Sequence, residues 1–257
     1  MNENIINKIA TENSIKPKQI KSVLSLLEEG NTIPFIARYR KEATGALDEE
    51  QIRQIDEVYQ YQINLAKRKE DVIRLIDEKG LLTPELTESI NKCTKLVEVE
   101  DLYRPFKEKK KTKATEAIKN GLEPLAKIIM SQPMTIDINS VAKNYLCDAV
   151  SSIEDAIQGA KYIISEWISD NAYYRKWIRN YIYKNGLLVS KMKKNANDEG
   201  HIYEMYYDYN EMVKNIKPHR ILATNRGEKE GILTVSIDIN EEEIIDFLIS
   251  KNIKKNR

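Results

Sequence analysis

DEEQIRQIDEVYQYQINLAKRKEDVIRLIDEKG, residues 48–80, carries the strongest helical pattern in the sequence. Asp48 and Gln51 have the spacing of a capping box, in which each side chain accepts a hydrogen bond from a backbone N–H of the first turn. Apolar residues then recur at helical spacing as far as Gly80: Ile52, Ile55, Tyr59, Ile63, Ala66, Ile73 and Ile76. The pattern predicts one long helix, about 45 Å at 1.5 Å per residue, against which shorter helices pack.

Shorter helices are predicted on both sides of this long helix. Before it, Pro17 suits the first turn of one helix and Gly30 suits its end. The apolar positions of this helix and of its predecessor are Ile20, Val23, Leu24 and Leu27, and Ile5, Ile6 and Ile9. After it, capping residues predict three further helix starts: Thr83 before Pro84, Ser152 with Asp155, and Asn171, whose helix Gly186 would stop. The predicted fold class is therefore mainly α, a multi-helix scaffold.

The pattern changes after Gly186. Two β-compatible runs, 187–192 and 202–207, flank the turn-rich NANDEG and predict a hairpin. Pro218 opens a short helix expected to end at Gly227, and residues 232–237 alternate as a strand. Asn240 with Glu243 predicts the start of a last helix that reaches about Lys251. The expected regions are 1–82, helical with the long helix; 83–186, helical with a basic loop; and 187–257, a small mixed β and helix segment.

Composition and cysteine content exclude several classes of protein. Cys93 and Cys147 are far apart and outside metal-ligand spacing, so we expect buried thiols in a reducing cytosol. No run approaches the roughly 18 consecutive apolar residues of a membrane-spanning helix, and the start lacks the apolar core of a signal peptide. We therefore expect a cytoplasmic protein with no membrane partner.

Motifs for catalysis are absent from the sequence. It contains no glycine-rich nucleotide motif, P-loop, HExxH or paired CxxC. His201 and His219 have no partner at ligand spacing and are interpreted as solvated or capping residues, while a Ser-His-Asp set assembled only by folding stays open. GEKEG at 227–231 is interpreted as a reverse turn rather than a phosphate loop. We expect no catalytic residue, no cofactor and no metal.

Positive charge is concentrated locally, although the net charge is only +1. Residues 104–119 contain seven basic residues against two acidic ones, an excess of five. Such density attracts phosphates through counterion release, but it also suits a solvated loop that keeps the chain soluble. A smaller basic patch follows the short helix opened by Thr32 and Pro34, where cations also suit the helix dipole. The candidate nucleic-acid-binding residues are Arg38, Arg40, Lys41, Lys107, Lys109, Lys110, Lys111 and Lys113.

A second basic stretch, residues 173–194, contains seven basic residues and no acidic one, interleaved with aromatics. Aromatic side chains beside cations can stack on unpaired bases. Trp177 and Tyr181, however, lie four residues apart on a predicted helix, which is typical of packing against a core. Packing is the favoured interpretation of these aromatics.

Three ordered segments of the sequence resemble one known family. They are NTIPFIARYRKEATGALDEEQI at 31–52, VEVEDLYRPFKEKKKTKATEAIKNGLEPLA at 97–126, and residues 159–233, which include GLLVSKMKK and PHRILATNRGEKEGIL. Together they resemble the N-terminal region of the Tex family of bacterial transcription accessory proteins. Arg104, Phe106 and Glu108 depart from the family's aliphatic residue, tyrosine and proline, and Ala46 replaces a second glycine.

The resemblance implies a helical scaffold with a helix-turn-helix-like N-terminal part and a long central helix. Family members continue into a ribonuclease-H-like domain, helix-hairpin-helix motifs and an OB-type RNA-binding domain, so this sequence resembles a fragment. Nucleic acid, RNA or DNA, is the implied partner, mainly through the C-terminal domains, together with RNA polymerase. The alternative is a purely protein-interaction scaffold with no nucleic-acid contact, and a nucleic-acid hydrolase is the least favoured hypothesis.

Overall fold

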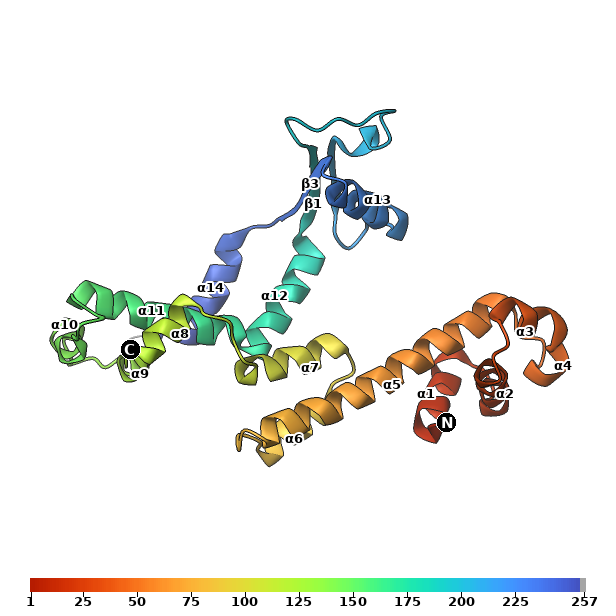
Figure 1. Cartoon of the computed structure of the whole chain (residues 1–257), viewed down its shortest axis with the longest axis horizontal. Coiled ribbons are helices and arrows are strands. Elements are labelled where there is room, and N and C mark those ends of the chain that lie inside the picture. Colours follow the sequence, from red (N-terminus) through yellow and green to blue (C-terminus); the bar gives the residue numbers. More distant parts are fainter. Residues whose placement is uncertain (255–257) are drawn as a thin grey trace. The chain divides into compact units, whose positions relative to one another are not determined.

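The computed structural model describes residues 1–254 and is mainly helical with one small sheet (Figure 1), which confirms the predicted fold class. The chain divides into two compact units, Met1–Tyr103 and the part that begins at Arg104. Each unit has its own hydrophobic core. The three-region division made from the sequence stays a prediction. No helix within residues 1–254 is long and apolar enough to cross a membrane.

The first unit begins with short helices that pack near the start of a long one. They are α1 (Glu3–Asn13), α2 (Pro17–Glu28), α3 (Ile33–Tyr39) and α4 (Lys41–Thr44), and they precede α5 (Glu49–Asp77). Asn2 caps α1, and Pro17 occupies the first turn of α2 as predicted. Their shared core is built mainly from the predicted isoleucines, among them Ile6, Ile9 and Ile20, which have no exposed surface.

The long helix α5 is confirmed, including the reciprocal cap between Asp48 and Gln51. Its first half buries Ile52, Ile55 and Tyr59, as expected. In the second half Ile76 is buried as predicted. Leu65 and Val72, which the predicted stripe did not include, are buried as well, whereas Ile63, Ala66 and Ile73 are only partly so. At about 100° per residue the second buried face is rotated about 110° from the first. The rotation follows from the packing partners, which change from α1–α3 to α6 (Pro84–Lys92) and α7 (Leu96–Tyr103).

The second unit is organised around α11 (Ile153–Asp170). This helix packs on α8 (Lys113–Lys119) and α9 (Glu123–Ser131), and α10 (Ile138–Ala142) lies against the same core. A Cβ on Gly159 would lie 2.3 Å from Leu122 Cδ1 and 3.4 Å from Ala117 Cβ, so a larger residue here would require the Leu122 side chain to shift. The predicted caps Ser152, for α11, and Asn171, for α12 (Ala172–Asn185), are both confirmed.

Three aromatic residues of α12, Tyr173, Tyr174 and Trp177, contact Phe247 of α14 (Glu241–Asn252). Trp177 stacks on Phe247 with ring centroids 3.7 Å apart and on Tyr181 at 5.3 Å. Asn240 accepts a hydrogen bond from the backbone N–H of Glu242, so the start of this last helix lies where the sequence predicted it. The packing interpretation is therefore supported for Trp177 and Tyr181, whereas Tyr173 and Tyr183 are more than half exposed.

A small antiparallel sheet follows α12. Its strands are β1 (Leu187–Met192), β2 (Asp208–Met212) and β3 (Leu233–Asp238), in the order β2-β1-β3, with Val189 opposite Asn210 and Ser236. Helix α13 (Pro218–Lys229) packs against β3. The strand predicted at 187–192 is confirmed. The strand predicted at 232–237 is displaced by one residue, to Leu233–Asp238.

The predicted strand at 202–207 is wrong. This segment contains the 3-10 helix η3 (Glu204–Tyr206), and β2 begins only at Asp208. The buried carboxylate of Asp198 accepts hydrogen bonds from the backbone N–H of Tyr203 and the hydroxyl of Tyr207, both at 2.8 Å. Ile202 and Met205 point to solvent, so their run of apolar residues does not form the face of a strand.

Two predictions about glycine and cysteine also need correction. Gly227 does not end α13, which continues to Lys229 before Gly231 turns the chain at φ +78°. A Cβ at Gly227 would lie 2.5 Å from Leu233 Cδ1, so this glycine serves close helix-strand packing and GEKEG is a helix end rather than a simple reverse turn. Cys93 is buried as expected, but Cys147 is exposed, and both are free thiols.

Candidate functional site

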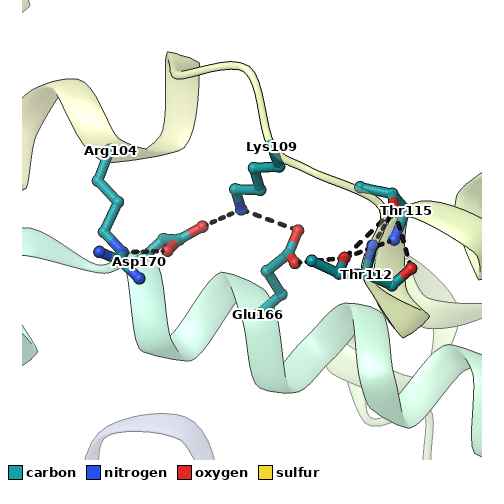
Figure 2. Close-up of polar contacts among 6 residues, drawn as sticks. All are labelled: Arg104, Lys109, Thr112, Thr115, Glu166 and Asp170. Carbon is teal, nitrogen blue, oxygen red and sulfur yellow. Dashed lines mark hydrogen bonds and ion pairs between the residues drawn. The ribbon is translucent and has the colours of Figure 1, made fainter.

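The basic loop, defined here as residues 104–113, lies along the C-terminal part of α11 (Figure 2). Arg104 Nε donates to Asp170 Oδ1 at 2.8 Å. Lys109 Nζ lies 2.8 Å from Glu166 Oε1 and also contacts Asp170 Oδ2. Thr112 Oγ1 donates to Glu166 Oε2 at 3.2 Å. Two carboxylates thus hold the loop at three positions, and we call Arg104, Lys109, Glu166 and Asp170 the ion-pair cluster.

Helical geometry explains why the two carboxylates act together. Glu166 and Asp170 are four residues apart, so they occupy one face of α11. Asp170 is the last residue of the helix, where the dipole disfavours an acid, and its side chain is only 7% exposed. Such a carboxylate is stable only when cations and hydrogen-bond donors face it. Arg104 and Lys109 supply both.

The environment of Lys109 keeps its ammonium group charged. Burial alone would lower the pKa of Lys109, but hydrogen bonds to Asp170 and Glu166 and the charges of both carboxylates raise it above its ordinary value. The side chain is 24% exposed. Lys109 therefore holds the loop in place, and its charge is directed at the protein rather than at solvent.

The C-terminal end of the basic loop is fixed by a helix cap. Thr112 Oγ1 accepts from the backbone N–H of Thr115 at 3.1 Å, and Thr115 Oγ1 accepts from the N–H of Thr112 at 2.8 Å. The ammonium group of Lys113 lies 5.0 Å from the ring centroid of Tyr162, a cation–π distance. Both contacts order the start of α8.

The remaining lysines of the loop are more exposed than Lys109. Lys107, Lys110 and Lys111 are exposed and make no ion pair with any of residues 1–254. Lys107 and Lys110 also line a pocket of about 490 Å³ beside the ion-pair cluster. Arg104 and Lys109 line the same pocket together with the acidic residues Glu108, Glu166 and Asp170, so cations and carboxylates are mixed there.

The other predicted patch, at 38–41, lies in the first unit. Arg38 is on α3, Arg40 joins α3 to α4, and Lys41 begins α4. All three are exposed, and the guanidinium carbon of Arg40 lies 5.4 Å from the ring centroid of Phe35. The candidate residues therefore form two separate sets, one in each unit.

Sequence reasoning missed the acidic half of the loop site. Glu166 and Asp170 are more than fifty residues from Lys109 in the sequence. Their four-residue spacing was a usable signal for a shared helix face. Nothing in the sequence, however, indicated which basic residues would face them, since only the packing of α8 on α11 brings the loop there.

The fold and this site define a class of protein: a helical scaffold that uses part of a basic loop internally and displays the rest. No group of three or more His, Cys, Asp or Glu within the described part of the chain could hold a metal ion. The chain belongs to the Tex family. Residues 3–77 match the Tex-like protein N-terminal domain, and residues 134–255 match the Tex central region-like family.

The chain is also similar to individual proteins. The chain is 51% identical over 252 residues to uncharacterized protein YdcI of Bacillus subtilis, covering 97% of this chain and 35% of the relative. It is 36% identical over 235 residues to transcriptional accessory protein Tex of Neisseria gonorrhoeae, covering 91% and 31%. It is 28% identical over 249 residues to S1 RNA-binding domain-containing protein 1 of Homo sapiens, covering 94% and 25%. The chain thus spans about a third or less of the length of these relatives.

Proposed function

We propose that this chain is the helical scaffold region of a transcription accessory factor, and that its basic loop contacts nucleic acid. The observation that carries the proposal is the division of the loop, in which Lys109 is held by α11 while Lys107, Lys110 and Lys111 are exposed. The names of two relatives, a transcriptional accessory protein and an S1 RNA-binding domain-containing protein, support it. A cytoplasmic location, the absence of catalysis and association with RNA polymerase belong to the same proposal.

Physical chemistry favours a loop held in this way as a contact for phosphates. Each exposed lysine that approaches a phosphate releases a condensed counterion, which supplies affinity without reading sequence. Ordering a free loop on binding would cost conformational entropy. The ion-pair cluster and the Thr112 cap order the loop when the chain folds, before any ligand binds. The exposed lysines are therefore presented on an ordered backbone.

A protein-interaction scaffold with no nucleic-acid contact is the second candidate. The observations in its favour are that the net charge is only +1, that Lys109 is paired with α11, and that Lys113, although exposed, lies over the Tyr162 ring. This leaves three displayed lysines in the loop, fewer than the sequence suggested. The helix-turn-helix-like character of α1–α3 stays a prediction under both candidates, since such geometry serves protein packing as well as DNA binding.

Fluorescence anisotropy over a range of salt concentrations tests the proposal. The full chain is titrated into labelled single-stranded RNA and duplex DNA, together with a Lys107→Ala, Lys110→Ala, Lys111→Ala variant. The magnitude of the salt slope for RNA should fall by about 2, since each single-strand phosphate contact contributes about 0.7. The matched control is Lys8→Ala, Lys18→Ala, Lys67→Ala, which removes the same charge from exposed residues of the first unit.

The two candidates predict different outcomes of this titration. Nucleic-acid contact through the loop requires that the loop variant lose affinity and slope while the control variant stays near the wild type. An equal loss in both variants would mean that only overall charge matters. No binding by the wild type, or no change in the loop variant, would favour the protein-interaction scaffold.

A further inference from the structure

The outer face of α3 carries aromatic side chains that the fold does not use. Ile36 is buried, and Ile33 and Ala37 pack beside it against the core of the first unit. Phe35 and Tyr39 lie on the other side and are 36% and 66% exposed. At about 100° per residue, the face formed by Phe35, Arg38 and Tyr39 is centred about 160° from the buried face. Packing within the first unit therefore does not explain these two aromatic rings.

The two rings and their neighbouring cations form a compact surface, which we call the α3 corner: Phe35, Arg38, Tyr39, Arg40 and Lys41. The centroids of the Phe35 and Tyr39 rings are 5.2 Å apart, with planes tilted by 45°. The guanidinium carbon of Arg40 lies 5.4 Å from the centroid of the Phe35 ring, a cation–π distance. Arg40 covers Phe35 in part, so Tyr39 offers the more accessible ring.

We propose that the α3 corner binds an unpaired base of a single-stranded nucleic acid. Tyr39 is the stacking surface, Phe35 supports it from one side, and Arg38, Arg40 and Lys41 face the flanking phosphates. The inference rests on the proposed function, because it assumes that the chain contacts nucleic acid. It adds a second contact site, in the other unit, and specifies the class of strand.

Chemistry favours an unpaired base over the other occupants of such a surface. Aromatic rings beside cations are the elements that single-strand-binding proteins use, because every base has a π face. Two points speak against a duplex as the occupant. Bases in a duplex are already stacked on both sides, and α3 has seven residues and is only about 10 Å long. Three cations within residues 38–41 complement a phosphate chain better than they complement the mixed surface of a protein.

The test compares strands that differ only in their bases. The full chain is titrated by fluorescence anisotropy into single-stranded DNA of about 12 nucleotides, a length within the site sizes of single-strand binders. The same length of abasic strand keeps the phosphates without the bases, and the duplex form keeps the bases paired. Tyr39→Ala should weaken binding to the normal strand at least about fivefold and leave abasic binding unchanged. Tyr39→Phe retains the ring and should bind like the wild type.

Control variants separate this inference from the proposed function. Tyr183→Ala removes a tyrosine of the second unit that is 58% exposed, and it should leave affinity unchanged. The inference is overturned if Tyr39→Ala has no effect, if it weakens abasic and duplex binding equally, or if Tyr183→Ala is as damaging. If the wild type binds, and binding is weakened by the triple Lys107→Ala, Lys110→Ala, Lys111→Ala variant but not by Tyr39→Ala, the loop contact stands and the α3 corner fails. When the wild type binds none of the strands, both fail.

Discussion

The basic loop of the second unit and the α3 corner of the first have similar clusters of cations but use them differently. In the loop, Lys109 and Arg104 pair with carboxylates of α11, and Lys113 lies over Tyr162. In the corner, Arg38, Arg40 and Lys41 make no ion pair with any residue of the described chain, and Arg40 lies over an aromatic ring instead. The density of lysine and arginine in a sequence is therefore not a measure of the charge available to a ligand.

The difference arises from what faces each segment. A loop that crosses the acidic end of a packed helix neutralises part of its own charge, since a nearly buried carboxylate requires a cation. A short helix whose outer face meets only solvent has no such requirement. Substitutions of the paired residues Arg104 and Lys109 should therefore change stability, whereas substitutions in the corner should change it little.

Asp170→Asn should give the largest effect on stability. The change removes the carboxylate charge from Arg104 and Lys109 and should cost about 2 kcal/mol, as for hydrogen bonds to charged groups. Both tryptophans, Trp167 and Trp177, lie in the second unit, so their fluorescence during urea unfolding reports on that unit. Asp148→Asn, at an exposed position of the same unit, is the control and should change stability by less than about 0.5 kcal/mol. Equal effects from the two variants would show that the ion-pair cluster does not stabilise the loop.

Much of the fold could be predicted from the sequence because it is determined locally. The caps at Asp48, Thr83 and Ser152 lie where their side chains predicted them, since a cap involves residues only two or three positions apart. The failures concern contacts between distant residues. Gly227 lies against Leu233 and Tyr203, which leave little room for a side chain there, and the rotation of the buried face of α5 depends on which helices pack there.

The candidate site was predictable only in part for the same reason. The lysines of the loop and the cations at 38–41 could be found by counting charge. The different role of Lys109 could not be found in this way, because its partners lie on α11, which follows more than forty residues later in the chain. The exposure of Phe35 and Tyr39 was equally hidden, since a helix of seven residues is too short to show which of its faces is buried.

Ala46→Gly should change the free energy of unfolding of the first unit by a smaller amount, and it should stabilise rather than destabilise. Ala46 follows α4 with φ +62°, a left-handed conformation that costs an L-residue with a Cβ about 1 kcal/mol or more. Glycine removes that strain but loses more chain entropy on folding, so the net gain should be about 0.5 kcal/mol. Amide hydrogen exchange of α1–α5 measures it. Ala43→Gly, within α4, is the matched control and should destabilise instead.

The pH dependence of the ion-pair cluster should be the smallest effect. The folded pKa of Lys109 is raised above its ordinary value of 10.5, so its contribution to stability is fully present below that pH. It is lost as the pH rises through the folded pKa. The difference in unfolding free energy between wild type and Lys109→Met, followed by tryptophan fluorescence, should stay constant between neutral pH and pH 10 and shrink above it. A difference that grows with rising pH would contradict the charge assigned to Lys109.

The most direct test of the division of the basic loop compares the stability changes caused by substituting two neighbouring lysines, Lys109 and Lys110. Lys109→Met and Lys110→Met remove the same charge and differ only in whether the ammonium group meets α11. Urea unfolding of the second unit should show a loss of about 1 to 2 kcal/mol for Lys109→Met and a change within about 0.5 kcal/mol for Lys110→Met. Equal losses, or a larger loss for Lys110→Met, would contradict the division of the loop into a held lysine and displayed ones.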